Sequence, residues 1–570
     1  MLSIRTRPYL ILAAVLGAST SVSAQSFEKA IAMVPNDAAG VMVVPSLQRL
    51  NGDMAEMMDR SGRGEAVIAG RPIDMLAAQL GLSAAFDERG SFAAWWTGDQ
   101  DTMVFAIPVA DAERFLNANL TRDEAAGEDT WQWNDELVHA RGIGKHVLIS
   151  TDADEVRGYE VGEGILAAMK TGLGAEAFAM LAKADIAMWA GPTAIAAMQE
   201  QSMAEAKASM DNREIDDSQR AMAMQMMTRM GTMGEGLQQL AGAIDIDALG
   251  VGLKGLAIFD PESDLGKAAM GGKARGNRGL LNKLPDNLFY MAGEIDIEGM
   301  GGVQRFVDLV QMTGLEDMEL PAWVLDMGPH LQGVQFAAYP SKLGLAMGGL
   351  MNDSDLFVQT TKPKMARELL EEWVKAADGV DGMIRRTSTW ATDKALRKGG
   401  TADEFTIQEE LLPKKERPEG SRSGDFATRK MMMGLVFGPR GMQGLAREVP
   451  DGLVVTFSRR PDVLDRATQA ASGGSSMSDN PMISAMRGWF IENADMEMFI
   501  DVGQIGKLAR QMMKIIPGAG GMNINIPEEM PPVGMAMGVD QGRVSGSLVI
   551  PSEVVGSMIG MAMQTGFAAP

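Results

Sequence analysis

The sequence of 570 residues contains no cysteine and only three histidines, His139, His146 and His330. Without cysteine the chain has no disulfide, no thiol nucleophile and no thiolate ligand for a metal ion. Three histidines are too few for a histidine-rich metal site. His139 and His146 flank a predicted turn and have no partner motif, so we interpret them as ordinary hairpin residues.

The templates of common enzymes are also missing. The chain has no GxSxG elbow for a serine nucleophile and no GxxxxGK[ST] loop for phosphate. Residues 250–255 match GxGxxG, but a dinucleotide fingerprint needs its glycines between a strand and a helix. Here an apolar strand follows the glycines, at residues 256–259. We therefore predict a glycine-rich strand and no cofactor.

Positive charge is scarce. The chain has 52 Lys and Arg residues against 75 Asp and Glu residues, which gives a formal net charge of −23. Nucleic-acid binding depends on clustered Lys and Arg, so we expect no nucleic-acid partner. The same charge argues against adsorption to anionic membranes.

Pairs of aspartates occur where turns or helices are expected to begin, and there Asp commonly caps a helix or stabilises a turn. They lack the additional oxygen ligands of a calcium loop, so we expect no metal site. The pairs are Asp99/Asp101, Asp152/Asp154 and Asp245/Asp247.

The N-terminus is typical of a secretory signal peptide. Arg5 and Arg7 precede the apolar run 9–17, and Val22 and Ala24 are the small residues of a cleavage site. The apolar run is shorter than the roughly 20 residues that span a bilayer. We predict cleavage after Ala24, a periplasmic or extracellular location, and no integral membrane segment in the mature chain.

An internal repeat organises the rest of the chain. A turn, a strand and a helical pattern at residues 34–37, 40–44 and 46–58 have counterparts at 284–287, 288–292 and 300–310. Further counterparts follow in the same order. They are 92–95 with 336–339, 103–107 with 356–360, 147–149 with 453–456, 184–189 with 494–499, and 249–259 with 535–550. Prolines at 108, 363 and 461 are each expected to open a helix.

Strands follow one another without intervening helices, as at 92–96 and 103–107, which indicates β-hairpins and antiparallel pairing. The predicted fold class is α+β, with two duplicated halves that are each a curved, mostly antiparallel sheet with helices on one face. The predicted segments are a signal peptide (1–24), a first module (25–278), a second module (279–562), an insertion with an exposed loop (397–449) and a tail (563–570).

Methionine is unusually common, with 48 residues. Met222, Met226, Met230 and Met233 follow a helical spacing within extra sequence of the first half, and residues 431–433 form a second cluster. Thioether clusters can bind Cu(I), but methionine also fills cores and forms adaptable binding surfaces. Met222, Met226, Met230 and Met233 are therefore candidates for a ligand or partner surface.

Trp96 is another candidate for that surface. Its neighbour Trp95 lies at a repeat position, which is typical of a core residue. Successive residues of a strand face opposite sides, so Trp96 should point away from the side that Trp95 faces. Packing against helices would explain Trp96 equally well.

The turn, strand and helix at 34–58, their repeat at 284–310 and the segment 255–259 resemble secreted bacterial proteins that carry a domain of unknown function. The resemblance covers most of the mature chain. It implies export and a duplicated module, and it brings no catalytic residues.

The sequence favours a secreted or periplasmic, non-enzymatic binding or envelope protein whose partner is a protein, a glycan or an apolar ligand. One alternative is a hydrolase that uses carboxylates alone, since paired Asp and Glu can perform acid–base chemistry. A second alternative is a methionine-rich copper-handling protein.

Overall fold

A computed structural model gives the fold. It describes residues 24–62, 85–98, 102–123, 127, 129–133, 136–160, 164–211, 234, 236–272, 280–313, 320–342, 344, 348–396, 400–416, 430–431, 433–515, 527 and 529–564. The chain divides into two compact units. The first contains Met1–Met270, Met312–Gly314 and Gly542–Pro570, and the second contains Gly271–Gln311 and Leu315–Gln541.

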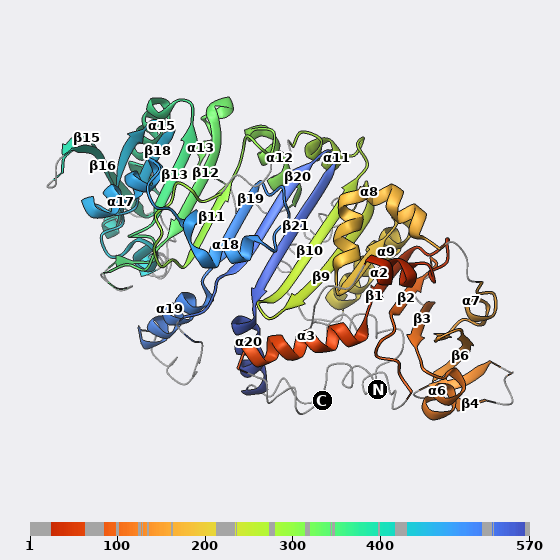
Figure 1. Cartoon of the computed structure of the whole chain (residues 1–570). Helices are drawn as coiled ribbons and strands as arrows, with labels where there is room; N and C mark the ends of the chain where they lie inside the picture. The colour runs from red at the N-terminus through yellow and green to blue at the C-terminus, as the bar shows by residue number, and fades with distance from the viewer. Residues whose placement is uncertain are drawn as a thin grey trace. The chain divides into compact units, whose positions relative to one another are not determined.

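The first unit is an α+β structure whose strands, in the described part of the chain, pair in antiparallel fashion. Across the sheet they follow the order β21-β10-β9-β8-β1-β2-β3-β7-β6-β5-β4 (Figure 1). The strands are β1 (Gly40–Val44), β2 (Phe92–Trp96), β3 (Met103–Pro108), β4 (Thr121–Arg122), β5 (Thr130–Trp133), β6 (Glu136–Ile143), β7 (His146–Ser150), β8 (Ile186–Ala190), β9 (Leu237–Asp247), β10 (Gly250–Phe259) and β21 (Arg543–Pro551).

Helices of the first unit cover both faces of its sheet. Met42 and Val44 of β1 pack with α3, whereas Val41 and Val43 pack with α2 and α8. The helices are α2 (Ala24–Ile31), α3 (Leu47–Arg60), α6 (Ala112–Asn119), α7 (Ala153–Arg157), α8 (Leu166–Lys183), α9 (Pro192–Asp211), α11 (Asp264–Ala269) and α20 (Ser552–Gln564). The prediction of helices on one face is therefore wrong. A strand that is buried along its whole length needs cover on both sides.

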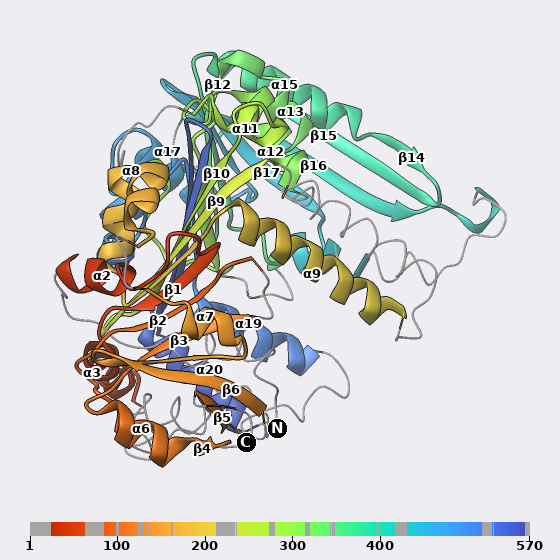
Figure 2. The same ribbon diagram turned by 90° about the vertical axis from the view of Figure 1, so that its right-hand side faces the viewer.

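The second unit is likewise an α+β structure. Its described strands pair in antiparallel fashion in the order β20-β19-β11-β12-β13-β18-β17-β16-β15-β14, and Figure 2 shows β15 and β16 as a long hairpin. The strands are β11 (Met291–Ile295), β12 (Leu331–Ala338), β13 (Asp355–Thr360), β14 (Gly379–Asp381), β15 (Ile384–Ala395), β16 (Thr401–Leu411), β17 (Met442–Val449), β18 (Gly452–Thr456), β19 (Met496–Ile500) and β20 (Val533–Asp540).

Both faces of the second sheet are also covered. Val358 of β13 packs in one apolar cluster with Leu370 of α15, and the residue before it, Phe357, packs in another with Leu464 of α17. The helices are α12 (Val303–Thr313), α13 (Ala322–Leu325), α15 (Pro363–Ala376), α17 (Pro461–Ala471), α18 (Pro481–Arg487) and α19 (Val502–Ile515), with 3₁₀ turns η3 (Gly328–His330), η4 (Lys414–Glu416) and η5 (Met477–Asp479).

The two strand orders correspond. The order β9-β8-β1-β2-β3-β7-β6-β5-β4 has the same sequence of connections as β20-β19-β11-β12-β13-β18-β17-β16-β15. A side-chain hydrogen bond also occurs in both units. Ile246 N donates to Asp185 Oδ2 over 2.9 Å, and Val539 N donates to Asp495 Oδ2 over 2.8 Å.

The strand register corrects one detail of the sequence alignment. The cross-strand rows are Trp189–Val41–Trp95 in the first unit and Phe499–Ala292–Ala337 in the second. If the two rows are aligned, Trp95 takes the place of Ala337 and not of Tyr339. The unit boundary differs as well. Residues 542–562, which the sequence analysis assigns to the second module, belong to the first unit.

Several local predictions agree with the structure. The helix predicted over residues 46–58 is α3, and Pro363 and Pro461 each open a helix. The GxGxxG segment forms strand β10. Pro108, however, ends β3, and the following helix begins after the cap Asp111.

Some predictions fall outside the described residues. These are the signal peptide up to residue 23, Asp99 and Asp101, the methionines at 222, 226, 230 and 233, and most of the loop in the insertion 397–449. Within the described part of the chain, no helix combines the length and the apolar character that crossing a bilayer requires.

Candidate functional site

The second unit brings three chain segments together at one end of three paired strands. Met291 of β11 lies opposite Ile500 of β19, which in turn lies opposite Val533 of β20. The residues just outside this row are therefore neighbours. They are the segment 286–289 before β11, Asp501 after β19, and Pro532 before β20. A hydrogen bond of 3.0 Å from Asp501 N to the carbonyl of Tyr290, which follows the segment 286–289, holds Asp501 beside that segment.

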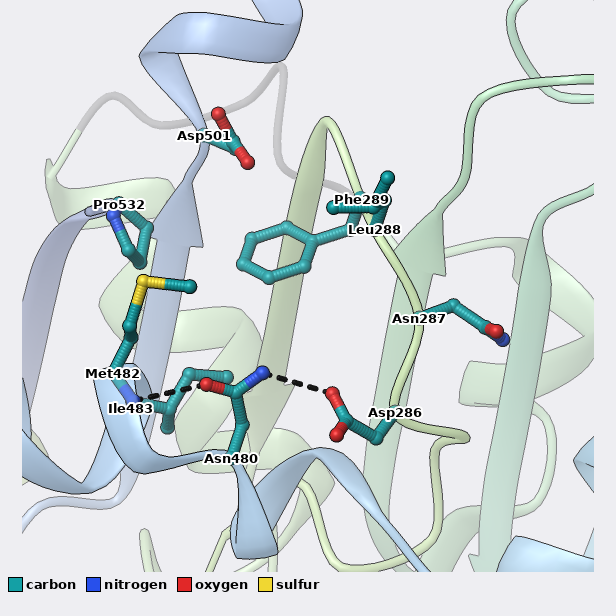
Figure 3. A pocket seen from close by; sticks show the side chains of 9 residues that line it. All are labelled: Asp286, Asn287, Leu288, Phe289, Asn480, Met482, Ile483, Asp501 and Pro532. Atoms are coloured by element: carbon teal, nitrogen blue, oxygen red, sulfur yellow. Dashed lines mark hydrogen bonds between the residues drawn. The ribbon is translucent and has the colours of Figure 1, made fainter. Parts of the chain in front are cut away.

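Helix α18 supplies the remaining wall. Asn480 caps this helix by accepting a hydrogen bond of 3.0 Å from Met482 N, and Pro481 occupies the first turn. The Asn480 Nδ2 group donates to Asp286 Oδ1 over 2.8 Å. This bond, drawn in Figure 3, links the start of α18 to the segment before β11.

These segments enclose a hollow of about 210 Å³ (Figure 3). Phe289 and Ile483 are buried at its base, whereas Leu288 and Met482 keep 67% and 48% of their surface exposed at its rim. The full lining is Asp286, Asn287, Leu288, Phe289, Asn480, Met482, Ile483, Asp501 and Pro532. The volume lies below the range of about 300–1,000 Å³ typical of sites for drug-sized ligands, so the hollow suits a group the size of one side chain.

Two carboxylates contribute negative charge to the hollow. Asp501 is almost buried and caps α19, where its Oδ1 accepts a hydrogen bond of 2.9 Å from Gln504 N. Burial raises the pKa of Asp501, and the backbone amides at the helix start act in the opposite direction. Asp286 is exposed. Arg466 approaches this end, where its Nη1 donates to Asn287 Oδ1 over 3.2 Å.

A row of buried polar side chains lies on the sheet and supports one wall. Glu294 of β11 lies opposite both Gln335 of β12 and Glu497 of β19. Glu294 Oε2 accepts a hydrogen bond of 2.5 Å from Leu281 N, and Gln335 Oε1 accepts one of 2.9 Å from Lys283 N. The row therefore holds the segment that leads into Asp286 and Leu288.

The opposite wall is fixed to the same row. Arg487, at the end of α18, binds Glu497 Oε2 through Nε and Nη2, over 2.9 and 2.8 Å. The Arg487 guanidinium also donates to Leu280 O. Because α18 begins with the residues that line the hollow, this buried ion pair connects the helix to the segment before β11.

Burial raises the pKa of Glu294 to about 8, and the neighbouring Glu497 and Asp296 add to this effect. Hydrogen bonding from Leu281 N and the charge of Arg487 oppose it. Burial also raises the pKa of Glu497, against the attraction of Arg487. Glu294 is therefore mostly protonated near neutral pH, which avoids two adjacent buried negative charges.

The side chains of the hollow and of the polar row differ from those at the matching positions of the first unit. The polar row corresponds to Val43, Ala93 and Ala187, which are apolar and buried. Gly191, whose N–H donates to Ala39 O, stands where Asp501 stands in the second unit. The charged hollow thus depends on side chains specific to the second unit.

The structure places Trp96 in packed surroundings. Trp96 lies on the opposite face from Trp95, as predicted, and packs against an apolar cluster that includes Ala39 and Ile195. A Cβ atom added at Gly40 would lie 2.1 Å from Trp96 Cζ2, so the indole covers that glycine closely. Trp96 is not part of the hollow, and the four candidate methionines lie outside the described residues.

His139 and His146 are residues of the β6–β7 hairpin, as predicted. His139 lies in β6 opposite Ser150, and His146 lies in β7 with its Nε2 3.0 Å from Ser91 O. Among the aspartate pairs, Asp152 caps α7. Asp245 lies within β9 and pairs with Lys254 over 3.0 Å, so its predicted position at a turn is wrong.

The first unit contains its own buried charges. Arg49 of α3 lies 2.8 Å from Asp185, and Asp53 is buried nearby with a pKa that burial raises to about 6. These groups lie at the packing interface of α3 with the sheet. The described residues contain no group of three or more His, Cys, Asp or Glu side chains arranged to hold a metal ion.

The sequence does not predict the hollow. It predicts a strand over residues 288–292, whereas β11 begins at Met291 and leaves Leu288 and Phe289 outside the sheet. The sequence signal that could have found it is the polar, proline-containing run 285–287, which delays the start of a strand.

Comparison with known proteins does not identify a family for this chain. No protein-family model and no curated protein match the sequence. Two solved structures, crystal forms I and III of TP0453, are each 10% identical to this chain and have a TM-score of 0.23. They cover 49% of this chain and 96% and 97% of those chains. At this TM-score the likeness indicates neither a shared fold nor a shared function.

Proposed function

We propose that the chain is an exported, non-enzymatic binding protein and that the hollow of the second unit is its ligand site. The observation that carries this proposal is the pair of exposed apolar side chains, Leu288 and Met482, at the rim of a hollow whose base is apolar. Exposed apolar groups gathered around a concavity are typical of ligand and partner sites. The ligand therefore presents an apolar group about the size of one side chain.

The carboxylates of the second unit support binding better than hydrolysis. Glu294 and Glu497 converge, but both are buried and hold neighbouring segments through hydrogen bonds. Asp501 caps a helix. No further observation favours the hydrolase, and the methionines on which copper handling would depend lie outside the described residues.

Export and duplication belong to the same proposal. Export is supported by the charged start, short apolar run and small residues of the N-terminal sequence. Duplication is supported by the corresponding strand orders and by the paired hydrogen bonds of Asp185 and Asp495. The resemblance to secreted bacterial proteins with a domain of unknown function stays a prediction.

The binding proposal is tested with a simple apolar probe. The mature chain is labelled with ¹³C at the methionine methyl groups and titrated with 1-hexanol, while methyl NMR spectra are recorded. Met482→Leu identifies the Met482 signal. We expect this signal to shift saturably, because the probe's alkyl chain contacts the thioether at the rim.

Met558 provides the matched control, since it is also an exposed methionine on a helix, with 55% of its surface exposed. Its signal should not shift. Met482→Gln should weaken binding of the probe, whereas Met558→Gln should not. If both signals respond alike and without saturation, the hollow is not a binding site and the proposal fails.

A further inference from the structure

We infer that the ligand of the hollow carries a positive charge next to its apolar group, as an alkylammonium or the side chain of a basic residue does. This inference rests on the proposed function, because it names the chemical class of the ligand for the same site. It follows from the kinds of polar atom that line the hollow and from the absence of cations among the lining residues.

Asp501 is the first group that favours a cation. Its carboxylate lies at one end of the hollow in Figure 3, beyond Pro532 and the Phe289 ring and away from Asn480 and Asp286. No ion pair joins it to a Lys or Arg among the residues that the structure describes. A ligand cation bound here would supply the countercharge of an almost buried carboxylate, and charge-assisted hydrogen bonds are the strong ones.

Asp286 and Asn480 form the opposite polar end. The Asn480 amide orients Asp286 by donating a hydrogen bond to Oδ1, one of the two carboxylate oxygens of Asp286. Asn480 accepts from Met482 N through its own oxygen, so both ends of this amide are used within the protein. The two carboxylates that line the hollow are acceptors, which match a donor-rich cation and repel an anion.

Two features oppose the binding of a cation, and their effects are smaller than that of the Asp501 carboxylate. The start of α19 carries a partial positive charge of about half a unit, which the full negative charge of Asp501 exceeds. Arg466 approaches Asn287 but is not among the lining residues. The formal net charge of −23 further favours the approach of a cationic ligand.

The test compares three probes that share one alkyl chain: hexylammonium, 1-hexanol and hexanoate. Affinities are measured on the mature chain from the Met482 methyl signal. We expect hexylammonium to bind about tenfold or more tightly than 1-hexanol, and hexanoate to bind most weakly. The advantage of hexylammonium should shrink as salt is added.

Asp501→Asn removes the charge and keeps a side chain that caps helices well. This variant should lose most of the preference for hexylammonium over 1-hexanol. Asp111→Asn is the matched control, because Asp111 also caps a helix by accepting a backbone hydrogen bond, from Arg114 N over 2.9 Å, in the first unit. It should keep the full preference.

The outcomes separate the two claims. If 1-hexanol binds and hexylammonium binds no better, the inferred charge of the ligand is wrong while the binding site stands. A preference that survives Asp501→Asn undiminished also overturns the inference. If neither probe binds saturably, the proposed function fails and the inference fails with it.

Discussion

Replacing Glu294 with glutamine is expected to stabilise the second unit at about pH 8 and to leave its stability nearly unchanged below about pH 4.5. The substitution keeps the size of the side chain and the oxygen that accepts from Leu281 N. It removes the ionisable group from the buried row. The effect should therefore appear only where the unfolded chain ionises Glu294 and the folded chain does not.

The direction follows from the raised pKa. Glu294 has an ordinary pKa of 4.5 and a pKa of about 8 in the folded protein. Below 4.5 both states bind the proton, and the stability associated with the neutral side chain is fully present. Between 4.5 and about 8 the unfolded state releases the proton first, so the free energy of unfolding falls as pH rises.

The magnitude follows from the same interval, 8 − 4.5 = 3.5 pH units. At about 1.4 kcal/mol per unit, the ceiling is roughly 5 kcal/mol at about pH 8. Glutamine avoids this loss, so we expect a gain of about 2–5 kcal/mol there. Hydrogen exchange of peptides from β11 and β19 during urea unfolding reports on the second unit specifically.

Glu298→Gln provides the control, since Glu298 is exposed on the same segment of chain beyond β11. Its effect should stay within about 0.5 kcal/mol at either pH. The reasoning is refuted if Glu294→Gln destabilises the second unit at about pH 8. That result would mean that Glu294 is ionised when folded and that the polar row needs its charge.

Three further predictions concern packing, charge and metal content. Gly40→Ala should lower the free energy of unfolding by about 1–3 kcal/mol, because the added Cβ would meet the Trp96 ring. Gly52→Ala in α3 adds a Cβ that meets nothing within 4 Å and should stabilise the helix slightly. Urea unfolding measures both changes in stability. Arg49→Met should cost about 1–3 kcal/mol in the same assay, because Asp185, whose pKa burial raises to about 8, loses a buried partner but can take up a proton; a cost near zero would contradict this. Elemental analysis of the purified mature chain should find no stoichiometric copper or zinc, and one tightly held metal per chain would contradict our reading of the methionines.

Local features of the fold could be predicted from the sequence because nearby residues determine them. The β2–β3 hairpin follows from two apolar runs separated by a polar turn, and Pro363 and Pro461 mark helix starts. Cover on both faces could also have been predicted. The run 41–44 is apolar without alternation, which is the pattern of a strand buried on both sides.

The polar row and the hollow could not be predicted because they depend on strand register. Glu294, Gln335 and Glu497 come from three strands that are distant in the sequence, and only the pairing shows that they are neighbours. The hollow likewise joins segments that meet at the end of a row of paired residues. A single sequence carries no direct signal for such contacts, and a shift of one residue would reverse which side chains share a face.

The position of β21 has a consequence for the order in which the protein is completed. This strand pairs with β10 along nine consecutive residues, from Gly250 opposite Pro551 to Ile258 opposite Arg543, and it belongs to the first unit. During synthesis, β10 emerges long before its neighbour does. The sheet of the first unit therefore cannot be completed until residues 543–551 have been made, so a fragment that stops near residue 270 would expose the backbone of β10 and tend to pair with other chains.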